Sequence, residues 1–291
     1  MKHLISLLDW TADEIADTLR LAAEFKEKPL SRADALPGRT LAMIFEKSST
    51  RTRVSFEVAM RRLGGHALFL SSRDLQLGRG ETVAVTARVL GRMCDAIMVR
   101  VFEHDKLQTL TLSGVPVING LSDLLHPCQA FADAMTIIEH KGSLAGRTLA
   151  YLGDGNNVAH SLINIAARTE LAVRVGTPEG YEPDAKIVEA ARAEGADVAL
   201  SYDPAEAVAG ADVVYTDTWA SMGQEDEAEA RARAFHPFQV NAALFAKAAP
   251  DAIFMHCLPA HRGEEVTDDV IDSDRSVVFD EAENRVHTER A

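Results

Sequence analysis

The chain has 291 residues, of which 47% are hydrophobic and 25% are charged, proportions that are ordinary for a folded protein and exclude extensive disorder. Because a domain usually contains roughly 100–200 residues, this length favours two domains. The formal net charge of −14 argues against a general nucleic-acid-binding protein, since such proteins hold phosphate backbones with clustered Lys and Arg side chains.

The cysteines, Cys94, Cys128 and Cys257, are odd in number and widely spaced, without a CxxC or Cys/His zinc pattern. They predict free thiols in a reducing compartment, and we expect no metal and no other cofactor. The first ten residues include Asp9 and contain neither a continuous apolar core nor a small-residue cleavage site, so they do not resemble a signal peptide. No uninterrupted run of about 18 apolar residues predicts a membrane span. The expected location is therefore the cytoplasm.

Apolar runs alternate with amphipathic helical patterns along the first half of the chain. Strands are predicted at Thr40 to Phe45, His66 to Leu70, Ala96 to Val101 and Val115 to Ile118. Helices are predicted at Arg51 to Leu63 and at about Glu81 to Met93. A strand, a loop and a helix in repeated order are typical of a parallel sheet flanked by helices.

The second half repeats this order, with a long helix predicted at Pro127 to His140 between the halves. Its strands are predicted at Thr148 to Leu152, Ala172 to Val175, Asp197 to Leu200, Asp212 to Thr216 and Ala252 to His256. A strand-like run at Val277 to Phe279 precedes a polar, helix-prone end. We therefore expect an α/β protein with two domains, each a parallel sheet flanked by helices, joined by long helices. The first comprises residues 1–135 with a helix at 280–291, and the second residues 136–279.

A hydroxyl-rich and basic motif, Ser48-Ser49-Thr50-Arg51-Thr52-Arg53, follows the first predicted strand and begins a helix. Ser and Thr are common helix N-caps, so the motif alone is also compatible with simple capping. The unpaired N–H groups and the positive dipole end of a helix bind anions, and Arg adds bidentate hydrogen bonds. The motif lacks the GxxxxGK[ST] pattern of a Walker loop, so it predicts a phosphate site of another kind.

Ser49 to Arg53 resembles the phosphate-binding signature of the aspartate and ornithine carbamoyltransferase family. Further segments of the family follow as Gln76-Leu77-Gly78-Arg79 in a loop, Arg100 at a strand end and His126-Pro127-Cys128-Gln129 at a helix start. The chemistry is consistent, because a carbamoyl oxygen that becomes negative needs donors and a carbamoyl NH2 needs acceptors. The resemblance implies that carbamoyl phosphate is bound by Ser49, Thr50, Arg51, Thr52, Gln76, Arg100, His126 and Gln129.

The second half begins with Gly153 to Val158 after a predicted strand, an arrangement that also occurs in dinucleotide-binding proteins. That interpretation fails because Val158 occupies the place of the third glycine of GxGxxG, and the next strand ends at Val175-Gly176-Thr177 without an acidic residue for a ribose. Asparagine at a helix start can instead meet a carboxylate. By the resemblance, Asn157 contacts an amino-acid substrate.

The remaining motifs resemble the ornithine branch of the family. Asp217 to Gly223 is similar to its mobile Ser-Met-Gly loop, which implies that Asp217, Ser221 and Met222 bind ornithine and that loop closure excludes water. His256 to Gly263 is similar to its second signature, which implies that Cys257 lies beside the ornithine amine and that Cys257 and the Leu258 carbonyl contact the carbamoyl group. Glu283 to Thr288 implies that Arg285 also reaches this group.

The resemblance implies transfer of the carbamoyl group from carbamoyl phosphate to the side-chain amine of L-ornithine, in arginine biosynthesis. The residues implied to act catalytically are Arg100, His126, Asp217 and Cys257. Asp217 and Cys257 would orient ornithine without forming a covalent intermediate. A homotrimer is implied, with the side chain of Gln76 supplied by a neighbouring subunit, and neither nucleic acid nor membrane is an expected partner.

Two alternative functions fit part of this pattern. A carbamoyltransferase for another amine, such as putrescine or N-acetylornithine, is disfavoured by Asn157 and Ser221-Met222-Gly223. A catalytically inactive member with a regulatory role predicts a broken phosphate signature, whereas Ser49 to Arg53 is intact.

Overall fold

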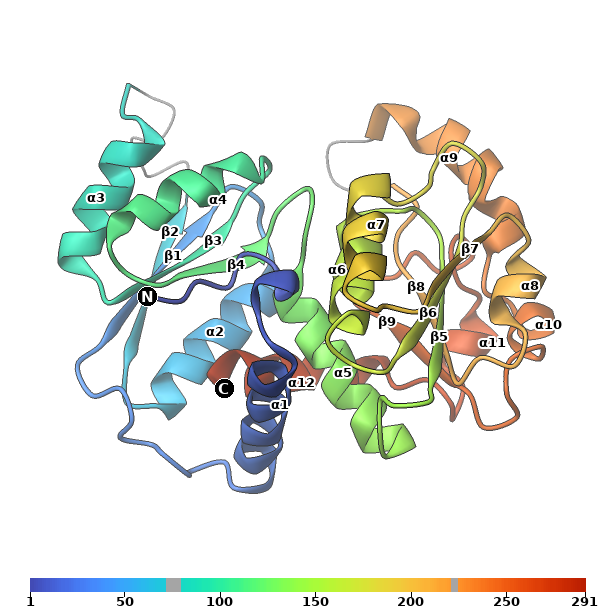
Figure 1. The fold of residues 1–291 in the computed structure, drawn as a ribbon, viewed down its shortest axis with the longest axis horizontal. Helices are drawn as coiled ribbons and strands as arrows, with labels where there is room; N and C mark the ends of the chain where they lie inside the picture. The colour runs from blue at the N-terminus through green and yellow to red at the C-terminus, as the bar shows by residue number, and fades with distance from the viewer. Residues whose placement is uncertain (72–79, 221–224) are drawn as a thin grey trace. The chain divides into compact units, whose positions relative to one another are not determined.

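The computed structural model describes residues 1–71, 80–220 and 225–291, whose contacts divide into two compact units (Figure 1). Unit 1 comprises Met1–Ala132 with Asn284–Ala291, and unit 2 comprises Asp133–Glu283. The helices α5 (Pro127–Lys141) and α12 (Val278–Arg290) each contain residues of both units. Each unit is described by itself below.

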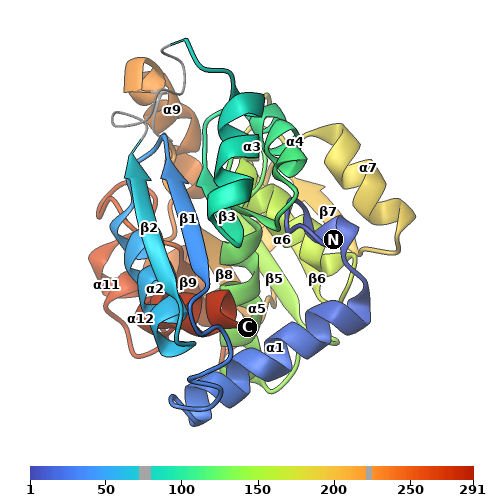
Figure 2. The ribbon, with the colours of Figure 1, turned by 90° about the vertical axis from the view of Figure 1, so that its left-hand side faces the viewer.

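Unit 1 contains a four-stranded parallel sheet in the order β2-β1-β3-β4. Its elements are α1 (Ala12–Glu27), β1 (Thr40–Phe45), α2 (Thr50–Arg62), β2 (His66–Ser71), α3 (Val83–Met93), β3 (Ala96–Arg100), α4 (Asp105–Leu110) and β4 (Val117–Leu121), with short 3-10 helices at Leu7–Asp9 and Thr111–Ser113. Figure 2 shows β2, β1 and β3 side by side. Ala42 and Ile44 of β1 pack toward α3 and α4, whereas Leu41, Met43 and Phe45 pack toward α2 and α5. Both faces are apolar, as expected for a strand buried on two sides.

Unit 2 contains a five-stranded parallel sheet in the order β7-β6-β5-β8-β9 (Figure 1). Its strands are β5 (Thr148–Leu152), β6 (Ala172–Gly176), β7 (Val198–Ser201), β8 (Val213–Thr216) and β9 (Ile253–His256). Its helices are α6 (Asn157–Ala166), α7 (Ala185–Ala193), α8 (Pro204–Val208), α9 (Ala228–Phe235), α10 (Ala242–Phe245) and α11 (Asp268–Ile271), with 3-10 helices at Glu225–Glu227 and His236–Phe238. One face packs on α8, α10 and α11 through residues that include Leu152, Val214 and Phe254.

The two parallel sheets confirm the predicted α/β class, and the predicted free thiols are also found. One predicted strand is wrong, because Val278 begins α12. Only Ser276 bridges to Phe254 of β9, after which the chain turns into the helix and leaves Phe279 76% exposed. Among residues 1–71, 80–220 and 225–291, no helix has the length and apolarity needed to cross a membrane.

Candidate functional site

Each sheet has a switch point, a pair of neighbouring strands from which the chain continues toward opposite edges of the sheet. Ligands of open parallel sheets bind there, beyond the carboxyl ends of the strands. In unit 1 this point lies between β1 and β3, where Glu46 N donates to Arg100 O at 2.8 Å. In unit 2 it lies between β5 and β8. The motif at Ser49 follows β1 and Arg100 is the last residue of β3, while Asn157 follows β5 and Asp217 follows β8. Each unit therefore has some of its predicted residues at its own switch point.

The start of α2 in unit 1 combines several donors for an anion. Ser49 caps the helix, because its Oγ accepts a hydrogen bond from Thr52 N at 3.3 Å, and the two hydroxyl oxygens lie 3.1 Å apart. Thr50 and Arg51 are the first two residues of the helix, whose first turn contains no acidic residue. The positive dipole end is thus not neutralised locally, an arrangement that suits a phosphate.

Arg285 connects α12 to this helix start within unit 1. One guanidinium nitrogen donates to Gln129 Oε1 at 2.8 Å, and the other terminal nitrogen lies 3.4 Å from Thr52 Oγ1. Arg285 also pairs with Glu289, four residues later on α12. Although Arg285 acts in the opposite direction, burial raises the pKa of Glu289 to about 7. Desolvation therefore outweighs the ion pair at this carboxyl group.

His126 lies just before α5 and is buried. Burial lowers the pKa of its imidazole well below the ordinary value, and the positive charges of Arg285, Arg100 and Arg51 lower it further. The ring is consequently neutral at physiological pH and can donate a hydrogen bond without adding charge. The positive charges that lower this pKa belong to Arg51, Arg100 and Arg285, which lie on different elements of unit 1.

Asp217 in unit 2 is buried after β8 and accepts hydrogen bonds from two side chains. Asn156 Nδ2 donates to its Oδ2 at 2.9 Å, and the Cys257 thiol donates to its Oδ1 at 3.1 Å. Asn156 is the N-cap of α6, accepting from Val158 N at 2.9 Å through its Oδ1. Asn156 was not predicted as a site residue, and the adjacent Asn157, which was, is the half-buried first residue of α6. Two neighbouring asparagines offer the same chemistry, so only the cap geometry distinguishes them.

Cys257 and Leu258 follow β9 in a segment held by His256. Burial and the negative charges of Asp217 and Glu281 raise the pKa of the Cys257 thiol well above its ordinary value. It is therefore a neutral donor, which is inconsistent with a thiolate nucleophile. His256 Nδ1 accepts from Leu258 N at 2.8 Å, while its Nε2 lies 3.0 Å from Glu265 Oε1. These bonds hold Leu258 at a φ of 56°, in the left-handed region that non-glycine residues rarely adopt.

Three predicted site residues, Gln76, Ser221 and Met222, lie outside the described residues. Gly223, in the same loop, also lies outside the described residues.

Two groups of potential metal ligands occur in the described part of the chain. Their members are Asp217, His256 and Cys257 in one group, and His261, Glu264 and Glu265 in the other. In the first group both ring nitrogens of His256 bond to protein atoms, and the thiol bonds to Asp217. These hydrogen bonds account for the clustering without a metal ion.

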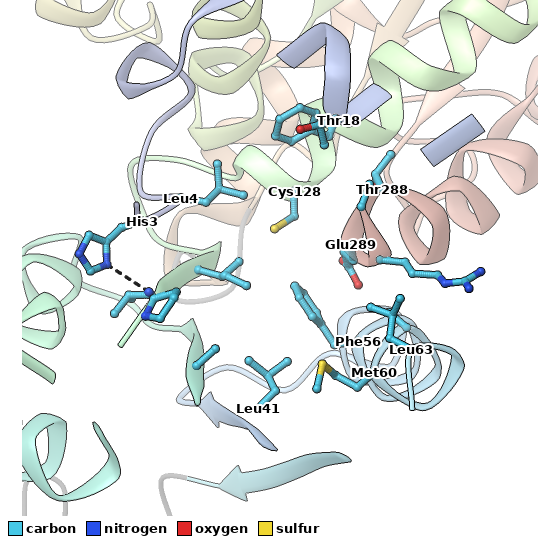
Figure 3. Close-up of a pocket in the computed structure, with 18 of the residues that line it drawn as sticks. His3, Leu4, Thr18, Leu41, Phe56, Met60, Leu63, Cys128, Thr288 and Glu289 are labelled. Carbon is cyan, nitrogen blue, oxygen red and sulfur yellow. Dashed lines mark hydrogen bonds between the residues drawn. The ribbon is translucent and has the colours of Figure 1, made fainter. Parts of the chain in front are cut away.

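A cavity of about 360 Å³ in unit 1 lies next to α2 and the end of α12 (Figure 3). Leu41, Phe56 and Met60 are among the apolar side chains that line it, together with the carboxyl group of Glu289. An apolar wall and an acidic group do not suit a phosphate dianion, so this cavity is not the anion site.

Comparison with known proteins identifies the family to which the two halves of the chain are similar. The sequence matches the family model of the carbamoyl-P binding domain of aspartate/ornithine carbamoyltransferase over residues 2–139, and that of the Asp/Orn binding domain over residues 145–291. An anabolic ornithine carbamoyltransferase from Pyrococcus furiosus is 58% identical over 297 residues, which cover 100% of this chain and 94% of the relative. The ornithine carbamoyltransferase from Anoxybacillus flavithermus is 57% identical, with 100% and 95% covered.

Solved structures give the same result. The ornithine carbamoyltransferase from Pyrococcus furiosus matches with a TM-score of 0.95 at 58% identity, covering 99% of this chain and 95% of that one. The enzyme of that name from Thermus thermophilus matches with a TM-score of 0.92 at 43% identity, covering 100% and 96%. The chain therefore belongs to the aspartate/ornithine carbamoyltransferase family.

Proposed function

We propose that this chain transfers the carbamoyl group of carbamoyl phosphate to the side-chain amine of L-ornithine, giving L-citrulline and phosphate for arginine biosynthesis. Relatives that match along the full length of the chain carry the name ornithine carbamoyltransferase, and one of them is named anabolic. The observation that carries the proposal is the start of α2, which Ser49 caps without an acidic residue in the first turn and which the Arg285 guanidinium reaches at Thr52. A ligand with a phosphate dianion and a carbamoyl oxygen needs both features.

Carbamoyl phosphate is assigned to unit 1, for which we propose domain limits of 1–135 with 280–291. Its phosphate contacts the start of α2 through Ser49, Thr50, Arg51 and Thr52. Its carbonyl oxygen accepts from Arg100, His126 and Thr52, which stabilise the charge that develops there. The carbamoyl NH2 donates to Gln129, whose Oε1 also accepts from Arg285, and to the Leu258 carbonyl. The side chain of Gln76 is supplied by the neighbouring subunit of a homotrimer.

L-Ornithine is assigned to the second domain, residues 136–279. Asp217 faces its amino groups, Asn157 faces its carboxylate, and Ser221 and Met222 cover it. The side-chain amine resembles that of lysine, so its deprotonation near neutral pH costs about 4–5 kcal/mol from a pKa near 10.4. The protonated Cys257 thiol adds a neutral donor without becoming a nucleophile.

The reaction is a direct substitution at the carbamoyl carbon. The neutral amine forms a C–N bond, the bond from that carbon to the phosphate oxygen breaks, and the departing phosphate takes the proton lost by the amine. Arg51 and the dipole of α2 stabilise the phosphate as it leaves. No covalent enzyme intermediate is needed, and we propose that the reaction takes place in the cytoplasm.

An amine panel tests this function. The protein is incubated with carbamoyl phosphate and, separately, with L-ornithine, putrescine, N-acetylornithine or L-aspartate, and each carbamoylated product is measured. Citrulline should form at least about 100-fold faster than any other product, because a site built around a buried carboxylate discriminates strongly against unpaired polar groups. A faster reaction with another amine would reassign the substrate, and no product with any amine would refute the function.

A further inference from the structure

A pair of buried carboxyl groups lies beneath the ends of β8 and β9 in unit 2. Asp133 of α5 and Glu281 of α12 are 1% and 0% exposed. The hydroxyl oxygen of Tyr215, on β8, lies 3.1 Å from Glu281 Oε1 and 3.4 Å from Asp133 Oδ1. One phenol thus bridges acids from two helices.

The number of protons in this arrangement is limited by its chemistry. A hydroxyl group donates a single proton, and an ionised carboxylate can only accept hydrogen bonds. If both carboxyl groups were ionised, Tyr215 would satisfy one of them and face the lone pairs of the other. Two buried negative charges bridged by one hydroxyl group would also repel each other strongly. One proton on the pair resolves both conflicts.

Glu281 also holds the strand that leads to the ornithine site. Its Oε2 accepts from the backbone N–H of His256 at 2.9 Å, one residue before Cys257. Tyr215 lies two residues before Asp217, and Cys257 donates to Asp217 at 3.1 Å. Two sets of contacts therefore connect the ends of β8 and β9. Glu281 contacts Tyr215 of β8 and the backbone of His256 of β9, and the Cys257 thiol donates to Asp217.

We propose that Asp133 and Glu281 share a single proton, and that this protonated pair is a positioning device that holds Asp217 and Cys257 in place for ornithine. The proposal rests on the function proposed above and deepens it by adding residues that do not contact the substrate. A hydrogen-bonded pair with one proton fixes both strand ends and carries one negative charge beneath the site in place of two.

The surrounding charges support this assignment. Burial and the neighbouring Asp133 raise the pKa of Glu281 well above its ordinary value, against the lowering effects of His256 N–H and Tyr215. The groups that face the pair are Tyr215 from β8 and His256 from β9, with Cys257 and Asp217 beyond them. Burial and these acids also raise the pKa of the Tyr215 phenol, so Tyr215 remains a donor.

The first experiment tests whether Asp133 and Glu281 together carry one proton. The infrared spectrum of the wild-type protein should contain a band of a buried protonated carboxyl group near pH 8.5, where Glu289, with a pKa of about 7, is ionised. Glu281→Gln and Asp133→Asn should each abolish that band, because the remaining carboxylate then accepts from the new amide. A band that persists in either variant would show that each acid keeps its own proton, and an absent band in the wild type would refute the pair as well. Neither result depends on the reaction that the protein catalyses.

The second experiment tests positioning by steady-state kinetics. Glu281→Gln preserves the acceptor for His256 N–H, so its KM for ornithine should stay within about twofold of the wild type. Glu281→Ala removes that acceptor and should raise the KM for ornithine by roughly tenfold, with the KM for carbamoyl phosphate unchanged. Glu283→Gln, at an exposed position of the same helix, is the matched control.

Tyr215→Phe covers the case in which Glu281→Ala does not fold, since it removes the bridging hydroxyl and keeps the ring stacked on Tyr151. A rise of about threefold in the KM for ornithine is expected. An unchanged KM, or an equal loss for both substrates, would contradict the positioning role. If the wild type forms no citrulline, the proposed function fails. The infrared result would still show whether Asp133 and Glu281 share one proton.

Discussion

The candidate site of unit 1 and that of unit 2 have opposite charges around similarly buried groups. In unit 1, burial and the positive charges of Arg285, Arg100 and Arg51 lower the pKa of His126 and keep its imidazole neutral. In unit 2, carboxylates surround Cys257, and they and burial keep its thiol protonated. Burial disfavours any charged form, and each set of neighbours adds to that effect. Both sites thereby contain a neutral hydrogen-bond donor within a strong field, positive in one unit and negative in the other.

This contrast explains how one protein can bind an anion and a cationic amine. A dianionic phosphate is stabilised by the field of unit 1 and would be repelled by that of unit 2, whereas an ammonium group has the opposite preference. Substitutions in the two units should therefore affect the two substrates separately. The predictions below test that separation, from the largest expected effect to the smallest.

Arg100→Ala removes a cation and a donor to the proposed oxyanion in unit 1. It should lower kcat/KM for carbamoyl phosphate by about 10³, a typical loss for a donor aimed at developing charge. Steady-state kinetics with varied carbamoyl phosphate measure this effect, and Arg92→Ala, at an exposed position of α3, is the control. A loss below tenfold would remove Arg100 from the site.

Glu289→Gln tests the acid that lies among the cations of unit 1. Because burial raises the pKa of Glu289 to about 7, the folded protein binds this proton more tightly than the unfolded chain does. The wild type should therefore lose up to about 3 kcal/mol of unfolding free energy as the pH rises from about 4.5 to about 7. Urea unfolding across this range should show a flatter profile for Glu289→Gln, and parallel profiles would contradict the raised pKa.

Asp217→Asn keeps the shape of the unit 2 carboxylate and removes its charge. It should lower kcat/KM for ornithine by about 10², roughly the value of one buried charged hydrogen bond. Carbamoyl phosphate binding, measured by titration calorimetry without ornithine, should not change. Asp269→Asn, at an exposed position of α11, controls for net charge. Equal damage to both substrates would show that the two sites are not separate.

Cys257→Ser replaces the thiol with another neutral donor. It should lower kcat/KM for ornithine by about tenfold or less, since one hydrogen bond changes in length and strength. Alkylation of Cys257 should also remain slow near pH 8, because the thiol stays protonated. A loss beyond a thousandfold would instead indicate a covalent role.

The sequence predicted most accurately the strands that are buried on both faces. Thr40–Phe45 and Thr148–Leu152 occur as predicted, because continuous apolar runs identify strands buried on both faces. The run at Val277 was wrongly predicted as a strand, because two buried valines beside an exposed Phe279 fit the period of a strand as well as that of a helix. Val117–Leu121 extends past the predicted end through Asn119, whose side chain donates to Ile5 O at 3.1 Å. That partner is distant in sequence and could not be inferred locally.

The residue types of the candidate site followed from the sequence, whereas their ionisation did not. The order of the motifs led to the prediction of Arg51, Arg100 and His126 as site residues, but the neutrality of His126 depends on tertiary neighbours. Asp133 and Glu281 carried no signal at all, because each is an ordinary acidic residue in a helical pattern and only the fold brings them to Tyr215.

The composition of unit 1 has a consequence for the order of events during synthesis. Unit 1 joins Met1–Ala132 to Asn284–Ala291, so the whole of unit 2 is translated before unit 1 can be completed. Arg285, one of the three cations that lower the pKa of His126, leaves the ribosome more than 150 residues after His126 itself. A nascent chain therefore carries an anion site that is deficient in charge until Arg285 has been added and has docked. Carbamoyl phosphate should be captured only after that step, when its binding also stabilises the docked end of α12.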